Sequence, residues 1–130
     1  MKRIFQLFLI TLTSLALLAC SKKLDFKNAS LNPLPDSSSR QVLLTESVDI
    51  ELDNMQTFRL AAGSRWEMVG RLPPGIVYRP VNTTLLIAEG QVFDAFLIVS
   101  EGNDRLQGFY LPVKRAYVQL KSPIPLSLQK

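Results

Sequence analysis

Apolar residues recur at alternate positions along the chain after residue 40. Asp49 and Glu51 separate the apolar residues of one such stretch, residues 48–52. A repeat of two places apolar side chains on one face of an extended chain and polar ones on the other, which predicts half-buried β-strands. The apolar positions of the first two stretches are Val42, Leu44, Val48, Ile50 and Leu52.

Further short apolar stretches continue as far as residue 120, and residues that favour turns separate them. Pro73-Pro74-Gly75 and Glu89-Gly90-Gln91 are the clearest of these turn signals. We expect one β-domain over residues 41–121, with an all-β fold built as a small antiparallel barrel or sandwich. The remaining expected strands are 57–61, 66–69, 76–78, 84–88, 92–100, 106–111 and 113–120.

Two flanking segments have compositions that disfavour regular structure. Residues 20–40 are rich in Asn, Pro and Ser and predict a flexible tether. An alternative is that this segment orders on a partner. Residues 122–130 begin with Ser-Pro-Ile-Pro, which predicts the end of the sheet and an extended C-terminal tail. The candidate partner contacts in the tether are Leu24, Phe26, Leu31 and Leu34.

The N-terminus has the pattern of a targeting segment. Lys2 and Arg3 precede an apolar run from Ile4 to Leu18. As a helix, this run of about 15 residues would span roughly 22 Å, short of the hydrocarbon core of about 30 Å. The pattern therefore disfavours a permanent transmembrane helix. The run ends in Leu17-Leu18-Ala19-Cys20, which resembles the lipobox of bacterial lipoproteins.

The resemblance implies that residues 1–19 are a cleaved signal peptide and that Cys20 carries a covalent lipid. Several acyl chains on one residue would anchor the protein stably in a membrane. In such lipoproteins an Asp after the cysteine retains the protein at the inner membrane. Ser21 stands at that position here. The resemblance thus implies an outer-membrane protein whose domain faces the periplasm.

An ordinary secretory signal is the rival interpretation of the same segment. Ser14-Leu15-Ala16 satisfies a small-x-small cleavage rule and would leave Cys20 as a free thiol. The chain contains one cysteine, and an unpaired thiol is a liability in an oxidising compartment. Lipidation explains both why Cys20 is present and why the chain has no second cysteine to pair with it.

Composition narrows the function of the remaining chain. Removing residues 1–19 from the 130-residue chain leaves 111 residues, and loss of Lys2 and Arg3 lowers the formal net charge from +4 to +2. No basic run or stripe remains, so we expect no nucleic-acid partner. The chain has no histidine, which removes the commonest general base and zinc ligand. We predict a protein that is not an enzyme and holds no metal or cofactor beyond the lipid on Cys20.

Acidic residues offer the remaining catalytic alternative. Glu46, Asp49, Glu51 and Asp53 could supply a carboxylate pair of the kind that cleaves glycosides. The last three of them alternate with apolar residues. They are explained more simply as the solvent-facing side of one strand.

Arginine and aromatic residues supply the candidate interaction site. Both residue types are enriched in protein interfaces. The alternative is that the aromatic residues belong to the core and the arginines to the solvated surface. The surrounding stretch, Gly63 to Tyr78, resembles bacterial SH3-type domains loosely, which makes an SH3-like fold one form of the expected domain. The candidates are Arg65, Trp66, Arg71, Tyr78 and Arg79.

Three functions fit this sequence. The first is a non-catalytic accessory or binding module of an envelope assembly, with a protein partner. The second is an inhibitor or immunity-type lipoprotein directed against a cell-wall hydrolase or toxin, although such proteins often contain disulfides. The third is a binder of peptidoglycan or another ligand in an SH3-like groove, which requires Trp66 and Tyr78 to be exposed on one face.

Overall fold

The structure, a computed structural model, describes residues 23–34 and 40–130, so that Cys20 and the targeting segment lie outside the described residues. The predicted all-β fold is confirmed. Every strand pairing is antiparallel. The strands are β1 (Phe26–Asn28), β2 (Asn32–Pro33), β3 (Gln41–Leu44), β4 (Val48–Glu51), β5 (Thr57–Leu60), β6 (Arg65–Leu72), β7 (Gly75–Pro80), β8 (Leu86–Glu89), β9 (Gln91–Asp94), β10 (Phe96–Val99), β11 (Arg105–Leu111), β12 (Ala116–Pro125) and β13 (Leu128–Gln129).

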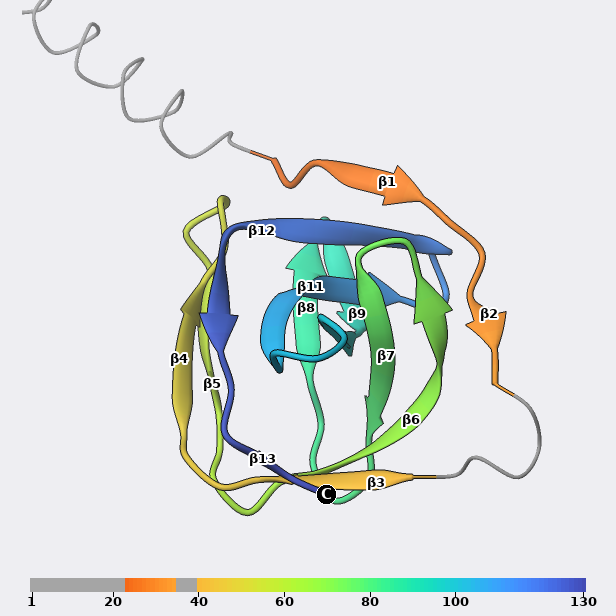
Figure 1. Ribbon diagram of the computed structural model, residues 1–130. Helices are drawn as coiled ribbons and strands as arrows, with labels where there is room; N and C mark the ends of the chain where they lie inside the picture. The colour runs from red at the N-terminus through yellow and green to blue at the C-terminus, as the bar shows by residue number, and fades with distance from the viewer. Residues whose placement is uncertain (1–22, 35–39) are drawn as a thin grey trace, which may run out of the picture.

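One large sheet and two hairpins make up the fold (Figure 1). The large sheet has the order β1-β12-β11-β10-β7-β6-β3-β13, and β2 pairs with β6 beside this path. The hairpins β4–β5 and β8–β9 are separate two-stranded sheets. The sequence predicts either a barrel or a sandwich. The described strands form a sandwich-like arrangement and do not close into a barrel. The arrangement gives no support to the SH3-type resemblance.

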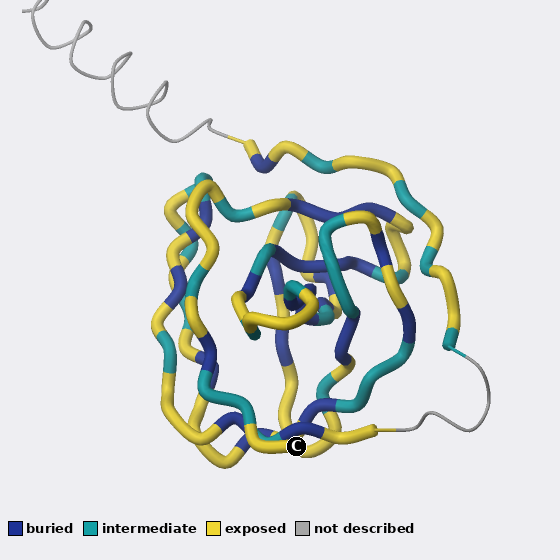
Figure 2. The backbone as a smooth tube through the Cα atoms, in the orientation of Figure 1, coloured by how far each residue is buried: buried dark blue, intermediate teal, exposed yellow. Residues whose placement is uncertain are grey.

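The main core lies between the large sheet and the two hairpins. Along each strand every second side chain points inward. All three sheets therefore contribute side chains to the core. Figure 2 shows the buried positions along the strands and the exposed ones at the turns. Representative core residues are Leu44 of β3, Ile50 of β4, Ile87 of β8, Leu97 of β10 and Phe109 of β11, each 2 % exposed or less.

A second, smaller core covers the opposite face of the large sheet. Val77 and Ile98 are fully buried there and pack with Tyr110 and Tyr117. These residues alternate in sequence with residues of the main core, as a strand with two buried faces requires. Ala29 and Leu31, which precede the main domain in the sequence, pack against this second core.

The chain crosses from the β8–β9 hairpin to the large sheet at Ala95. The sequence predicts one strand over residues 92–100, but the structure divides it into β9 and β10. Ala95 is fully buried, and its amide donates to the carbonyl oxygen of Leu85 at 2.9 Å. A continuous apolar run does not indicate this break, because both strands place apolar side chains in the core.

The prediction that the sheet ends before Ser122 is wrong. β12 continues to Pro125, and β13 then pairs with β3. Gln119 pairs with Gly108 and Ile124 with Leu106, so residues 120–123 form a bulge opposite one residue of β11. Pro123 lies in this bulge, where its missing N–H removes no ladder hydrogen bond.

The prediction of a flexible tether over residues 20–40 is wrong for residues 23–34, which we call the N-terminal strap. The strap contains β1, which pairs with β12, and β2, which pairs with β6. Figure 1 shows it running along the outside of the large sheet. The strap can approach β6 closely because Gly70 has no side chain. A Cβ on Gly70 would lie 2.5 Å from the carbonyl oxygen of Asn32 and 2.9 Å from Leu31 Cδ1.

Candidate functional site

The N-terminal strap is fastened to the domain near its start by Leu24. The Leu24 side chain is 7 % exposed and belongs to the main core. Its backbone amide donates a long hydrogen bond of 3.4 Å to Oε2 of Glu89, at the turn of the β8–β9 hairpin. Farther along, the amide of Ala29 donates to the carbonyl oxygen of Arg115 at 3.0 Å. The strap is therefore part of the folded domain.

Side chains of the β11–β12 turn and of β12 also hold the strap. Lys114 Nζ lies 4.4 Å from the ring centroid of Phe26 and 5.4 Å from that of Phe93. Both distances are within the range of a cation–π interaction. Lys27 Nζ donates to Gln119 Oε1 at 3.2 Å. Side-chain contacts thus hold the strap to the β11–β12 turn and to β12, and Lys114 links it to Phe93 of β9.

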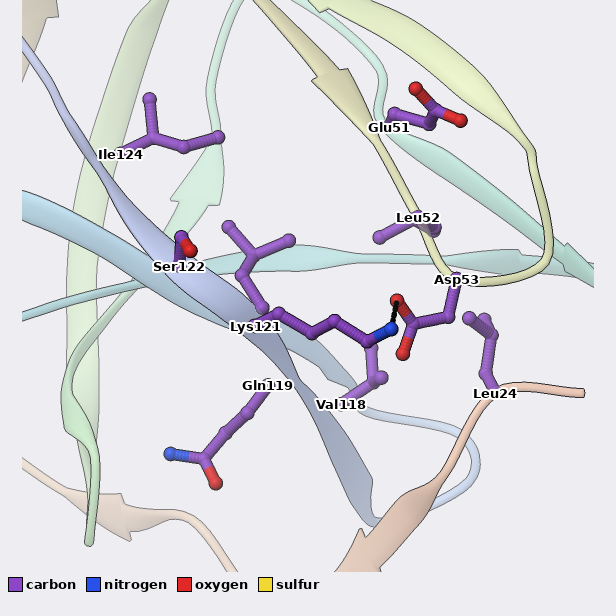
Figure 3. Close-up of a pocket in the computed structure, with 10 residues that line it drawn as sticks. Leu24, Glu51, Leu52, Asp53, Val118, Gln119, Lys121, Ser122 and Ile124 are labelled. Atoms are coloured by element: carbon purple, nitrogen blue, oxygen red, sulfur yellow. Dashed lines mark ion pairs between the residues drawn. The ribbon is translucent and has the colours of Figure 1, made fainter.

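A groove of about 300 Å³ opens beside Leu24, and we call it the Leu24 groove. It lies between the start of the strap, the end of β4 and the middle of β12, and Figure 3 shows its lining. The bulge of β12 forms one wall, because residues 120–123 leave the ladder there. The lining residues are Leu24, Glu51, Leu52, Asp53, Val118, Gln119, Leu120, Lys121, Ser122 and Ile124.

The Leu24 groove combines buried apolar residues with a charged rim. Leu24, Leu52 and Val118 are buried apolar residues in its lining. At the rim, Lys121 Nζ lies 3.7 Å from Asp53 Oδ1, and the two side chains are 72 % and 38 % exposed (Figure 3). Such an exposed ion pair contributes about 0–1 kcal/mol, so Lys121 can leave Asp53 at little cost. Apolar centres with polar rims are typical of protein interfaces.

The structure buries the two aromatic members of the predicted interaction site. Trp66 is 1 % exposed and Tyr78 is 3 % exposed. Trp66 Nε1 donates to Ser64 Oγ at 2.9 Å, and Ser64 Oγ donates to the carbonyl oxygen of Ala61 at 2.7 Å. The indole therefore has its hydrogen-bond partner within the core. The core interpretation of these aromatic residues agrees with their burial.

The three arginines of the predicted site are exposed and do not converge. Arg71 Nε lies 3.2 Å from Glu101 Oε1. Arg79 Nε donates to Glu67 Oε2 at 2.8 Å, across the β6–β7 pairing. Arg65 begins β6, and Arg71 is the penultimate residue of the same strand. The five candidate residues do not form one exposed surface.

Arg71 and Tyr78 nevertheless line one cavity of about 370 Å³. Its wall carries charges of both signs, including Arg40 and Asp104. Burial raises the pKa of Tyr78 above its ordinary value, and the negative charge of Asp104 raises it further, while Arg40 opposes both. Lys130 Nζ lies 3.9 Å from Asp104 Oδ1. The ion pairs of Arg71 and Lys130 leave this cavity with largely compensated charge.

Of the carboxylates considered for catalysis, Asp49 and Glu51 are exposed residues of β4, and Asp53 follows that strand. Asp49 Oδ1 accepts a hydrogen bond of 2.7 Å from Arg59 Nε across the β4–β5 hairpin, and this bond lowers the pKa of Asp49. Asp53 faces Lys121 instead. Within residues 23–34 and 40–130, no three His, Cys, Asp or Glu side chains gather in a way that could hold a metal ion. No helix in that part of the chain is long and apolar enough to cross a membrane.

Comparison with known proteins finds no matching family model, curated protein or solved structure.

Sequence reasoning does not identify the Leu24 groove as a site. Leu24 lies in a segment whose composition predicts a tether, and residues 118–124 lie where the prolines predict the end of the sheet. Part of the signal is present in the sequence, because Leu24, Phe26 and Leu31 are apolar residues in a polar segment. They contact the domain itself.

Proposed function

We propose that this chain is a lipoprotein of the bacterial outer membrane, anchored through a lipid on Cys20, and that its β-domain is a non-catalytic binding module of an envelope assembly. The lipobox resemblance of Leu17-Leu18-Ala19-Cys20 supports the anchor. Ser21 after the cysteine supports the outer membrane over the inner one.

One structural observation supports a function at the membrane surface. Leu24 is buried in the domain, and it follows Cys20 by only four residues. Four residues span at most about 14 Å. A lipid on Cys20 would hold the domain beside the bilayer, whereas a tether of 20 residues would let it reach far into the periplasm.

The Leu24 groove supports the binding function. It offers apolar surface and a weakly held lysine, which are features of a protein-binding surface. Trp66 and Tyr78, the residues expected to contact a glycan in an SH3-like groove, are buried. The structure therefore does not favour the glycan-binding function. We therefore propose a protein partner in the envelope.

The anchor is tested by fractionating cells that express Cys20→Ala. We expect this variant to leave the membrane fraction, while Ser21→Asp, the matched control, stays in membranes and moves from the outer to the inner membrane on a density gradient. Retention of Cys20→Ala in membranes would contradict the lipid anchor. An unchanged position of Ser21→Asp would contradict the proposed sorting.

The binding module is tested with a photo-crosslinking amino acid at Lys121, on the rim of the Leu24 groove. The same amino acid at Arg59, on the exposed face of the β4–β5 hairpin, serves as the control. We expect a discrete crosslinked product in native envelopes from position 121 and none from position 59. A product that contains one hydrolase or toxin would support the inhibitor function instead. Equal products at both positions would contradict a partner in the groove.

A further inference from the structure

The Leu24 end of the domain carries exposed apolar side chains. Met55, in the β4–β5 turn, is 71 % exposed, and Val92 of β9 is 63 % exposed. Leu86, on the same outward face of the hairpin as Val92, is 46 % exposed but opens β8 at the end away from the 89–91 turn. We call Met55 and Val92 the apolar tip.

Two hydrogen bonds place the β4–β5 turn, which carries Met55, beside β8 of the hairpin that carries Val92. The residues on both sides of Met55 bind the same residue of β8. Asn54 Nδ2 donates to the carbonyl oxygen of Ala88 at 3.3 Å, and the amide of Ala88 donates to Gln56 Oε1 at 3.1 Å. Ala88 is the cross-strand partner of Val92. The β4–β5 turn and the β8–β9 hairpin therefore present their apolar residues together.

The β4–β5 turn holds Met55 in a left-handed backbone conformation. Its φ angle is 66°, a left-handed conformation that favours Gly or Asn and costs a residue such as Met energy. The side chain gains no burial in return, because it is mostly exposed. The turn itself accounts for this angle, because Met55 is the last residue of a three-residue hairpin loop closed by the Met55 amide on the Leu52 carbonyl oxygen. What bears on the membrane is that the turn leaves the Met55 side chain mostly exposed.

The start of the strap lies at this same end. Glu89, the neighbour of Ala88, accepts the hydrogen bond from the amide of Leu24. Leu24 and the β4–β5 turn residue Asp53 line one groove. Figure 1 shows the strap entering beside the β4–β5 turn, and the β7–β8 connection at the opposite end, beside β3. The chain that leads back to Cys20 therefore starts beside the apolar tip.

We infer that the apolar tip rests on the lipid bilayer that holds the Cys20 anchor, so that the domain has a fixed, tip-down orientation on the membrane. This inference rests on the proposed lipid anchor, since four residues are too few to let the tip move far from the lipid. Contact is through apolar side chains and not through charge, because Lys23 and Lys121 at this end are accompanied by Asp53 and Glu89.

The test uses the full lipoprotein in vesicles of zwitterionic phosphatidylcholine. A lipidated Cys20 has no free thiol, so one introduced cysteine gives a unique site for an environment-sensitive fluorophore. Met55→Cys places the label on the tip. Val81→Cys, 45 % exposed in the β7–β8 connection, is the matched control at the opposite end. Flotation first establishes that each labelled protein is bound to the vesicles.

We expect a quencher attached near the lipid headgroups to reduce emission from position 55 several-fold more than emission from position 81. Equal quenching of the two labels in floated protein would overturn the orientation and leave the anchor intact. A protein that fails to float would overturn the anchor and the orientation with it. Quenching at position 55 only when anionic lipid is added would overturn the apolar contact.

Discussion

Leu24 and Glu89 are joined by a hydrogen bond of 3.4 Å from the Leu24 amide to the Glu89 carboxylate, across 65 positions of the sequence. This contact fastens the start of the N-terminal strap to the β8–β9 turn. It brings together the Leu24 groove, the apolar tip and the segment that leads to Cys20. Much of what we propose for this protein depends on that end of the domain.

Leu24→Ala should destabilise the domain, because it removes buried apolar surface from the main core. We expect a loss of about 2 to 3 kcal/mol in the free energy of unfolding, measured by denaturant titration. Leu86→Ala is the control. Leu86 is 46 % exposed, and its truncation should change stability by about 0.5 kcal/mol or less. Equal effects of the two substitutions would show that the strap is not part of the core.

Gly70→Ala should detach the strap from β6, since a Cβ there would overlap Asn32 and Leu31. We expect amide hydrogen exchange in residues 29–33 to accelerate markedly. The control is Gly90→Asn, because Gly90 has a φ of +74° with open space around its Cβ position, and Asn tolerates this conformation. Unchanged exchange in residues 29–33 of Gly70→Ala would contradict the close approach of strap and strand.

Trp66→Ala should prevent stable folding of the domain. It should not leave a folded domain that has merely lost its partner. Truncation of a buried tryptophan costs about 3 to 5 kcal/mol, a large part of the total stability of a small domain. Circular dichroism and thermal unfolding would measure this loss. Arg65→Ala, a change of the exposed neighbour, should leave the unfolding temperature nearly unchanged. A well-folded Trp66→Ala protein that loses its partner would restore Trp66 as an interaction residue.

Tyr78 should make the domain sensitive to alkaline pH. Burial, reinforced by Asp104, raises its pKa in the folded state, so the folded protein holds the phenol proton more tightly than the unfolded chain does. This contribution to stability is present below the unfolded pKa of about 10 and is lost as pH rises through the higher folded pKa. We expect denaturant titrations to show a smaller alkaline loss of stability for Tyr78→Phe than for the native chain.

Asp104→Asn tests the charge contribution to the same effect. The substitution removes the negative charge that helps to raise the pKa of Tyr78. We expect absorbance titration of tyrosinate to show one tyrosine ionising at lower pH than in the native chain. An identical titration curve would mean that burial alone raises this pKa.

The sequence predicts the strands well where the alternation is strict. β4 and β5 lie within one residue of the stretches predicted for them, residues 48–52 and 57–61. β3 contains the predicted apolar positions Val42 and Leu44. The sequence-based prediction fails where strand pairing in the folded chain overrides the local composition. Pro123 is accommodated because a bulge leaves its position outside the ladder, and the Asn-, Pro- and Ser-rich strap is ordered because Leu24 and Leu31 find apolar surfaces to cover.

The candidate site was predictable only in part. A stretch with neighbouring arginines and aromatic residues has the same sequence pattern whether the rings point into the core or toward solvent. Alternation shows which side chains share a face of the strand, and the partner strands decide which face is buried. The structure turns Trp66 and Tyr78 inward. The Leu24 groove combines residues from positions 24, 51–53 and 118–124, a combination that no local pattern can reveal.

The amino-acid sequence alone determined the all-β class, the strand periods and the absence of histidine, because these depend on local alternation and on which residue types are present. The tertiary structure decided which apolar residues share a core, that the strap belongs to the domain, and that Leu24, Met55 and Val92 belong to one end. Those relationships arise from contacts between distant segments, whose free energy depends on the whole folded chain.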